Sequence, residues 1–248
     1  MALLDGKVAL VTGASRGIGA ATAQVLAAEG ARVILTHRDS EEAAREVCAS
    51  LAGAGHRVIR ASATDTPALE RAAASVAESE RRLDVLVNNA AFTKVIPHAD
   101  MEALDDELFD TIMRTNVRGV FATIRAFRRL LAADGGGVIV NVSSLAARMG
   151  GGSNVAYCAS KAAVDNMAVS LGRALAPEIR VVSVAPGLVD TEFTAAWDPA
   201  VRERYIARSV LGRLPTPEDV AHAILAVVAH MPMTTGAVIP VDGGRPLG

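Results

Sequence analysis

Aromatic side chains are scarce in this chain, at 3% of 248 residues, although 51% of the residues are hydrophobic. The core must therefore be built from Ala, Val, Leu and Ile, a mixture that suits buried parallel strands covered by alanine-rich helices. Apolar runs of the ~20 residues that a membrane span needs are also missing, because Arg, Gly or Pro interrupts each run early. We expect a soluble protein with no membrane partner.

Cysteine is rare too, since the chain contains only Cys48 and Cys158. The first predicted strand begins within a few residues of Met1, which leaves no room for a cleavable leader, and we expect a cytoplasmic protein with reduced thiols. A formal net charge of −2 and a pI near 6.2 provide no broad basic field, so nucleic acid is not an expected partner. The histidines lack the mutual spacing of metal ligands, and we expect no metal site; they are His37, His56, His98, His222 and His230.

Short β-branched segments alternate with longer alanine-rich, amphipathic segments along the whole chain. Helices are predicted over residues 20–29, 41–52, 67–80, 105–131, 156–175 and 217–229, with a strand before each and a last strand in AVIPVDGG. Crossovers of this length join parallel strands. We therefore predict a single α/β domain over residues 1–248, a Rossmann-type doubly wound parallel sheet of about seven strands with helices on both faces.

The region from Leu188 to Leu214 breaks this alternation. It holds the only tryptophan, Trp197, together with Phe193 and Tyr205, in a chain otherwise poor in aromatic residues. Glycines lie near both ends of the region and could serve as hinges. We predict a mobile substrate flap with short helices that closes over the substrate and determines much of its selectivity.

The segment TGASRGIG follows the first predicted strand. Its glycines, Gly13, Gly17 and Gly19, permit a tight turn, a close approach of the backbone to a pyrophosphate and close packing of the next helix, whose free N–H groups attract the anion. An ordinary glycine-rich turn would look similar, and the spacing differs from the commoner G-x-G-x-x-G pattern. The position directly after the first strand favours a dinucleotide site.

The segment YCASK places Tyr157 and Lys161 on one face of a predicted helix. A free phenol has a pKa near 10, and each unit of depression requires about 1.4 kcal/mol of preferential stabilisation of the phenolate. A neighbouring ammonium and an oxidised nicotinamide can together supply several units, so that Tyr157 exchanges a proton near neutral pH. The alternative is an amphipathic Tyr and a Lys on a helix surface. Ser144, just past an earlier strand, favours the site over that alternative.

Further segments follow the later strands in a fixed order: NNAA at 88–91, RTNVRG around Asn116, NVSS ending at Ser144, YCASK, and APG at 185–187. Together they resemble the classical branch of the short-chain dehydrogenase/reductase family over essentially the whole chain, and in general the 3-oxoacyl-carrier-protein reductases. The resemblance implies that Ser144 orients the substrate oxygen and that Tyr157 is the general acid or base. It also implies that Lys161 binds the nicotinamide ribose and that Asn116 helps to hold a proton-relay water. These roles suit hydride transfer to or from a carbonyl carbon.

The resemblance also implies which residues contact the cofactor. Asn88 and Ala90 are expected beside it at the end of the fourth strand, Ala91 stands where the family commonly has Gly, and Ser62 stands where many relatives have Asp. The full predicted set is Gly13, Ser15, Arg16, Gly17, Ile18, Gly19, His37, Arg38, Ser62, Ala63, Asn89, Ala90, Ala91, Tyr157, Lys161, Pro186, Gly187, Val189 and Thr191.

The end of the second predicted strand, VILTHRD, predicts NADP(H) rather than NAD(H) as the cofactor. Enzymes that use NAD usually place an acidic residue there, and its carboxylate would repel a 2′-phosphate. Here His37 takes that place and Arg38 follows it, while Arg16 of the glycine turn can reach the same phosphate. A one-residue shift would bring Asp39 to the ribose and favour NAD, but Asp39 more resembles part of the acidic N-terminal cap of the next helix.

We therefore predict an NADPH-dependent oxidoreductase that reduces a ketone or 3-oxoacyl carbonyl of a small molecule to a secondary alcohol, or catalyses the reverse. The alternative is a non-catalytic NAD(P)-binding sensor or scaffold of the same fold, which would not need the intact set of Asn116, Ser144, Tyr157 and Lys161. Enoyl reduction is disfavoured, because enzymes with that activity typically separate Tyr and Lys by six residues rather than three.

Two long helices bear on the partners of the chain. The predicted helices over 105–131 and 156–175 carry wide apolar stripes, and their counterparts in the family pack against symmetry mates, so we expect a homotetramer or, failing that, a dimer. Reductases that act on carrier proteins usually place basic residues at the mouth of the site. Gly135 and Glu178 stand at two such places here, which argues against a carrier-protein substrate, although Arg128 and Arg129 lie nearby.

Overall fold

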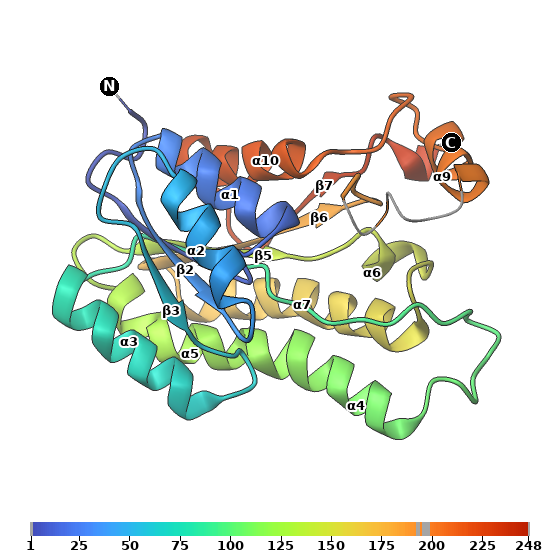
Figure 1. The fold of residues 1–248 in the computed structure, drawn as a ribbon, viewed down its shortest axis with the longest axis horizontal. Helices are drawn as coiled ribbons and strands as arrows, with labels where there is room; N and C mark the ends of the chain where they lie inside the picture. Colours follow the sequence, from blue (N-terminus) through green and yellow to red (C-terminus); the bar gives the residue numbers. More distant parts are fainter. Residues whose placement is uncertain (1, 192–193, 195–198, 248) are drawn as a thin grey trace.

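The protein is described from a computed structural model that covers residues 2–191, 194 and 199–247. One parallel sheet runs through the molecule in the order β3-β2-β1-β4-β5-β6-β7 (Figure 1), which confirms the predicted doubly wound sheet. Its strands are β1 Val8–Thr12, β2 Arg32–His37, β3 Arg57–Arg60, β4 Val85–Asn88, β5 Gly137–Val142, β6 Ile179–Pro186 and β7 Val238–Val241.

Helices cover both faces of the sheet (Figure 1). On one face lie α1 Gly17–Ala28, α2 Glu41–Ser50 and α10 Pro217–His230. The other face carries α3 Thr66–Glu80, α4 Asp106–Met113, the π-helical turn η1 Arg114–Arg118, α5 Gly119–Leu131 and α7 Val155–Ala174. Shorter helices lie near the strand ends: α6 Ala146–Met149, α9 Pro199–Ala207 and the 3-10 turn η2 Arg245–Leu247.

The core is aliphatic, as the composition requires. Every residue of β1 is buried, and the strand packs between Leu26 of α1 on one face and Phe127 of α5 on the other. Strand order reverses between β1 and β4, because the chain builds outward to β3 and then returns to the other side of β1. The crevice at such a reversal, beyond the carboxyl ends of the strands, is where doubly wound sheets bind their ligands.

Several local features differ from the prediction. The helical run predicted over 105–131 is interrupted by the π-helical turn at Arg114–Arg118, and α6 was not predicted. Helix α1 begins at Gly17, so the last two glycines of TGASRGIG lie inside the helix. Of the predicted flap, the structure describes 188–191, 194 and 199–214, and both Phe193 and Trp197 lie outside the described residues. Within the described ranges, no helix has the length and hydropathy of a membrane span.

Candidate active site

The glycine turn between β1 and α1 lets its backbone come close to neighbouring groups. Gly13 and Gly17 have positive φ angles of 64° and 54°, a conformation that strongly favours glycine. A Cβ at Gly19 would lie 2.4 Å from the carbonyl oxygen of Gly13 and 2.5 Å from Nδ2 of Asn89. Helix α1 has no side-chain cap and no acidic residue in its first turn, so the backbone N–H groups of that turn are open to an anion.

Thr12 and Asn89 hold this turn against the end of β4. The hydroxyl of Thr12 accepts hydrogen bonds from the backbone N–H groups of Asn89 and Ala90, both at 3.0 Å. In return, Nδ2 of Asn89 donates to the carbonyl oxygens of Thr12 and Gly13, also at 3.0 Å. Asn88, which we expected beside the cofactor, is buried and donates to Asn141 of the neighbouring strand at 2.9 Å.

A cavity of about 380 Å³ opens beside the glycine turn. His37, the last residue of β2, lines it, and its buried Nδ1 has no hydrogen-bond partner among the described residues. Ser62, which replaces the common Asp, faces the cavity and shares a hydrogen bond of 2.9 Å with Thr64. An open cavity with an unpaired buried ring nitrogen and a glycine cradle fits a dinucleotide. Of the predicted cofactor contacts, the cavity is lined by Gly13, Ser15, Arg16, His37, Arg38, Ser62, Ala63, Asn89, Ala90 and Ala91.

Charges gather where β2 ends. Nε of Arg38 donates to Asp39 at 2.5 Å, and Arg60 from β3 lies 3.9 Å from the same carboxylate. Asp39 therefore pairs with arginines and lines the cavity, whereas α2 begins at Glu41 with Ser40 as its N-cap, which corrects the expectation that Asp39 caps that helix. Sequence reasoning missed Arg60, although the register places it opposite His37 on the adjacent strand.

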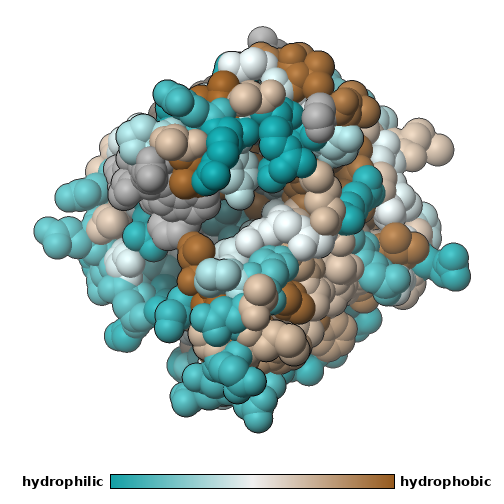
Figure 2. All heavy atoms as spheres, turned by 90° about the vertical axis from the view of Figure 1, so that its right-hand side faces the viewer, coloured by the Kyte–Doolittle hydropathy of each residue, from teal (hydrophilic) through white to brown (hydrophobic). Residues whose placement is uncertain are grey.

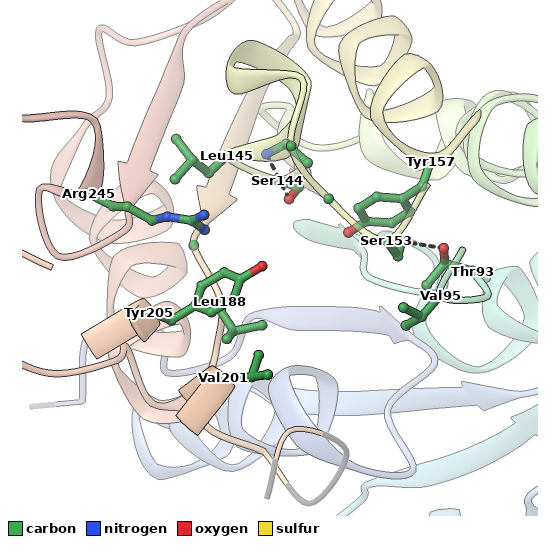
Figure 3. Close-up of a pocket in the computed structure, with 14 residues that line it drawn as sticks. Thr93, Val95, Ser144, Leu145, Ser153, Tyr157, Leu188, Val201, Tyr205 and Arg245 are labelled. Atoms are coloured by element: carbon green, nitrogen blue, oxygen red, sulfur yellow. Dashed lines mark hydrogen bonds between the residues drawn. The ribbon is translucent and has the colours of Figure 1, made fainter. Parts of the chain in front are cut away.

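A second cavity, of about 570 Å³, holds the predicted catalytic Ser144 and Tyr157 (Figure 3). Ser144 follows β5, and its Oγ accepts a hydrogen bond of 3.1 Å from the N–H of Ala146 at the start of α6. Tyr157 lies in the first turn of α7. The end of a strand and the start of a helix thus bring these two hydroxyl groups to one cavity.

Tyr157 is a phenol that holds its proton firmly in this chain. Desolvation raises its pKa, and although the side-chain hydrogen bond with Ser144 acts to lower the pKa, desolvation prevails. Lys161 Nζ lies 5.7 Å from the centroid of the Tyr157 ring. The sequence suggested that the Lys161 ammonium lowers the pKa of Tyr157. In the protein without cofactor, desolvation raises that pKa instead.

Lys161 is buried, with 5% of its surface exposed, and Nζ donates to the carbonyl oxygen of Val142 at 2.8 Å. Desolvation lowers its pKa to about 8, while the Asp165 carboxylate acts to raise it. The ammonium thus lies at the carboxyl end of β5, beneath the Tyr157 ring.

Asn116 lies within the π-helical turn η1 and is 1% exposed. Its Oδ1 accepts from the N–H of Phe92 at 2.8 Å, and its Nδ2 donates to the carbonyl oxygen of Phe92 and to Ser160 Oγ, both at 3.0 Å. Ser160 Oγ in turn donates to the carbonyl oxygen of Tyr157 at 2.7 Å. The amide therefore joins the loop after β4 to the helix that carries Tyr157.

Asn154 is a residue beside the candidate site that sequence reasoning missed. It is the buried N-cap of α7, and its Oδ1 accepts from the N–H of Tyr157 at 2.7 Å. Its Nδ2 donates to the carbonyl oxygen of Lys94 at 2.7 Å, which ties the cavity wall around Thr93 to the same helix. An Asn three residues before the predicted catalytic Tyr is a recognisable cap signal.

The segment after β6 connects the two cavities. Gly187 lines the catalytic cavity, while the side chain of Thr191 comes within 3.9 Å of a Cβ built at Gly17 in the glycine turn. Pro186 ends β6, and Val189 is buried. Ile18 packs on the core of the α1 face, so that its side chain supports the turn from behind.

The predicted flap contributes to the catalytic cavity through α9. Val201 and Tyr205 line that cavity, and Figure 3 shows both on the side opposite Tyr157. The strand ends, α6 and α9 lie at the right of Figure 1, and Figure 2 shows this side with hydrophobic and hydrophilic residues intermixed. Among the residues placed in the structure, no three His, Cys, Asp or Glu side chains gather as metal ligands would.

Known proteins share this arrangement over nearly the whole chain. A family model described as "Enoyl-(Acyl carrier protein) reductase" matches residues 13–245. The chain is 40% identical over 245 residues to a protein named as a ketoacyl reductase of the granaticin polyketide synthase of Streptomyces violaceoruber, covering 98% of this chain and 97% of that protein. It is 38% identical over 242 residues to a cis-4-hydroxycyclohexanecarboxylate dehydrogenase of Sinomonas cyclohexanicum, covering 96% of each.

A solved structure points the same way. A short-chain dehydrogenase/reductase from Burkholderia xenovorans matches with a TM-score of 0.89 and 36% identity, covering 98% of both chains. The likeness covers nearly the whole chain in sequence and in fold, and the predicted resemblance is confirmed. The chain belongs to the short-chain dehydrogenase/reductase family, in which it resembles the 3-oxoacyl-carrier-protein reductases, and it is an NAD(P)-dependent oxidoreductase.

Proposed function

We propose that this enzyme reduces a ketone or 3-oxoacyl carbonyl of a small molecule to a secondary alcohol, or catalyses the reverse, with NADP(H) and with Tyr157 as general acid or base. The observation that carries the proposal is the shared cavity of Ser144 and Tyr157, with Lys161 beneath the Tyr157 ring. Names of the relatives agree with this chemistry, since one is a ketoacyl reductase and another oxidises a ring alcohol that bears a carboxylate.

A bound nicotinamide supplies or accepts the hydride. In reduction, Ser144 donates a hydrogen bond to the substrate oxygen and orients it toward Tyr157, and the Tyr157 hydroxyl protonates that oxygen. The raised pKa of Tyr157 suits this direction, because it keeps the phenol protonated until the oxygen becomes basic. Lys161 holds positive charge beneath the ring and stabilises the phenolate that remains. In oxidation the same groups act in reverse.

Asn116 acts in this scheme mainly by position. Both N–H bonds of its amide and one acceptor site of its oxygen already serve Phe92 and Ser160. One acceptor site of the oxygen therefore remains for a relay water. The π-helical turn brings the amide to this place, and turns of this kind often mark functional sites.

Tyr157→Phe tests the chemistry. The variant keeps the ring and loses only the proton donor, so kcat should fall by about 10²-fold to 10⁴-fold, while the dissociation constant for NADPH, measured by fluorescence titration, should change little. Ketones, β-ketoacyl thioesters, quinones and keto-sugars form the substrate panel. Full turnover by the variant would refute the assigned role. Cofactor binding by the wild type without turnover of any panel member would favour the sensor or scaffold alternative.

Enoyl reduction is a less suitable activity for this site, despite the description of the matching family model. Tyr157 and Lys161 are separated by three residues, which places them on one face of α7 within one turn. A double bond conjugated to a thioester belongs in the same panel, and its exclusive reduction would favour the enoyl assignment.

The preference for NADP(H) is supported by the charges around the end of β2. Arg16 and Arg38 line the cofactor cavity, and Arg60 lies beside them, against the single carboxylate of Asp39. The excess of guanidinium groups suits a 2′-phosphate dianion, which would take the place of Asp39 as the partner of Arg38. His37 ends β2 where an acidic residue would repel the phosphate.

The comparison of kcat/KM for NADPH and NADH tests this preference in the wild type, in Arg38→Asp and in Arg71→Asp, a matched charge reversal at an exposed position of α3. The wild type and the Arg71 variant should prefer NADPH, and the Arg38 variant should lose at least tenfold of that preference, because one charge-assisted contact is removed. A wild type that prefers NADH would contradict the assignment.

The homotetramer is supported by an apolar surface on α4, α5 and α7. Phe109, Phe121 and Val169 are exposed by 38%, 42% and 45%, and they lie on the helices that the sequence suggested as contacts. Covering such side chains is a usual reason for association. Light scattering at micromolar concentration should give a mass well above that of one 25.6 kDa chain, and Phe121→Glu should lower it.

The remaining assignments complete the proposal. Residues 1–248 act as one domain in which the region 188–214 covers the substrate, a role that Val201 and Tyr205 support by lining the catalytic cavity. The enzyme acts in the cytoplasm, where NADP(H) is available.

A further inference from the structure

One charged side chain, Arg245, lies among the described residues that line the catalytic cavity. It begins η2, just after β7, so the last part of the chain delivers it to a site built mainly by earlier segments. Figure 3 shows its guanidinium pointing into the cavity from the side opposite Tyr157, with Leu145 above it and Leu188 below it in this view. The cavity therefore has the Tyr157 hydroxyl at one side and a cation at the other, and its lining includes the apolar side chains of Leu145 and Leu188.

The Arg245 guanidinium is held in place, and no carboxylate of the described residues pairs with it. Its central carbon lies 4.3 Å from the centroid of the Tyr205 ring, a stacking contact that fixes the plane of the group. Its Nε is buried without a hydrogen-bond partner among the described residues, and none of the ion pairs within those residues includes Arg245. An unpaired buried donor is costly and calls for an explanation, and a ligand bound to this guanidinium would provide one.

We infer that Arg245 binds a carboxylate of the substrate, so that the enzyme takes small keto acids or hydroxy acids whose carboxylate lies across the cavity from the reacting carbon. This assignment rests on the proposed function, because it names the substrate class of the same site. A planar carboxylate monoanion matches one guanidinium fork. A phosphate dianion would need more positive charge than the described lining offers.

Two anchors determine how such a substrate lies. The carbonyl oxygen binds at Ser144 and Tyr157 and the carboxylate binds at Arg245, while the hydrocarbon between them lies along Leu145 and Leu188. Fixing both ends of a small molecule leaves one productive orientation, which is how enzymes gain rate from binding. An uncharged ketone of equal size lacks the second anchor, so it should bind more weakly.

Two matched pairs of substrates test the inference: 4-oxocyclohexanecarboxylate and 5-oxohexanoate, each beside its methyl ester. We measure kcat/KM with the better of NADPH and NADH for the wild type, Arg245→Gln and Arg148→Gln, a control at an exposed arginine of α6. The wild type and the control should prefer at least one acid over its ester by about tenfold to hundredfold. In Arg245→Gln the acid-to-ester ratio of kcat/KM should fall toward one, because KM for the acid rises.

An acid-to-ester ratio near one in the wild type for both pairs would overturn the inference, as would an equal ratio in the wild type and Arg245→Gln. If Arg245 only supports Tyr205 and the fold, acid and ester turnover will fall together, the ratio will stay unchanged, and the inference fails.

Calorimetric binding of the two acids in the presence of NADP⁺ separates this inference from the proposed function. Binding that depends on Arg245 but leads to no turnover supports the carboxylate site and contradicts the proposed chemistry. Turnover of esters and acids alike supports the chemistry and contradicts the carboxylate site. If neither acid binds, the inference is wrong.

Discussion

Lys161→Met should show that the buried ammonium costs the cofactor-free protein stability. Desolvation lowers the pKa of Lys161 from 10.5 to about 8, which corresponds to about 3 kcal/mol of destabilisation at pH 7 relative to a neutral group. The substitution also removes the hydrogen bond to Val142, and an unsatisfied buried carbonyl costs about 1–3 kcal/mol. The two effects nearly cancel at pH 7, so the pH dependence is the sharper measure.

The sign follows from proton binding. Between pH 8 and 10.5 the unfolded chain holds the Lys161 proton more than the folded chain does, so wild-type stability rises with pH in this window. Below pH 8 the destabilisation is fully present. From pH 7 to pH 9 the wild type should therefore gain about 1 kcal/mol relative to Lys161→Met. When the unfolding free energy of Lys161→Met is subtracted from that of the wild type, the contributions of the other titrating groups cancel.

Urea denaturation at pH 7 and pH 9, without cofactor, measures this difference. Lys94→Met makes the same substitution at an exposed lysine, and its difference from the wild type should stay constant within about 0.5 kcal/mol. A wild-type advantage over Lys161→Met that is flat or falls from pH 7 to pH 9 would refute the argument that burial controls this ammonium.

Three further substitutions test other parts of the structure. Gly19→Ala places a Cβ 2.4 Å from a backbone carbonyl oxygen of the glycine turn. The free energy of unfolding should therefore fall by about 1–3 kcal/mol, and the affinity for NADPH should be lost. Gly151→Ala, which places its Cβ in open space, is the control for the thermal unfolding measurement. Asn154→Ala removes the N-cap of α7, costing about 1 kcal/mol, and assays should show kcat falling more than NADPH affinity. Asp219→Asn breaks the pair with Arg213 that lowers the pKa of this carboxyl, so a stability loss of about 1 kcal/mol at neutral pH should shrink as pH falls below 3.8.

Much of the fold could be predicted from the sequence, because its signals are local. A buried parallel strand and an amphipathic helix differ in the spacing of apolar residues, and that spacing is readable within one element. Gly13 and Gly17 have positive φ angles that few other residues adopt, so TGASRGIG indicated its turn. Tyr157 and Lys161 share a helix face whatever surrounds the helix. The family resemblance then predicted that Ser144 acts with them, and in the structure Ser144 and Tyr157 line one cavity.

The rest depended on contacts between segments distant in sequence. The π-helical turn around Asn116 goes with hydrogen bonds to Phe92 and Ser160, which no periodicity within the helix could reveal. Arg60 reaches Asp39 only because β3 lies beside β2. The raised pKa of Tyr157 is likewise a consequence of desolvation, which is a property of the packed protein.

The catalytic cavity shows the same division. The residue types in YCASK and NVSS were by themselves enough to predict a proton donor and a hydroxyl that binds the substrate oxygen. Only the tertiary structure decided what faces them, because the crossovers of the sheet bring α9 and the segment after β7 to the carboxyl edge beside β5. Arg245 lies in the turn Arg245–Leu247, for which sequence reasoning predicted no role in the site, and its proposed role depends on its stacking on Tyr205 across from Tyr157. The proposed chemistry rests on short motifs that can be recognised in the sequence, whereas the proposed substrate selection rests on segments that come together only after folding.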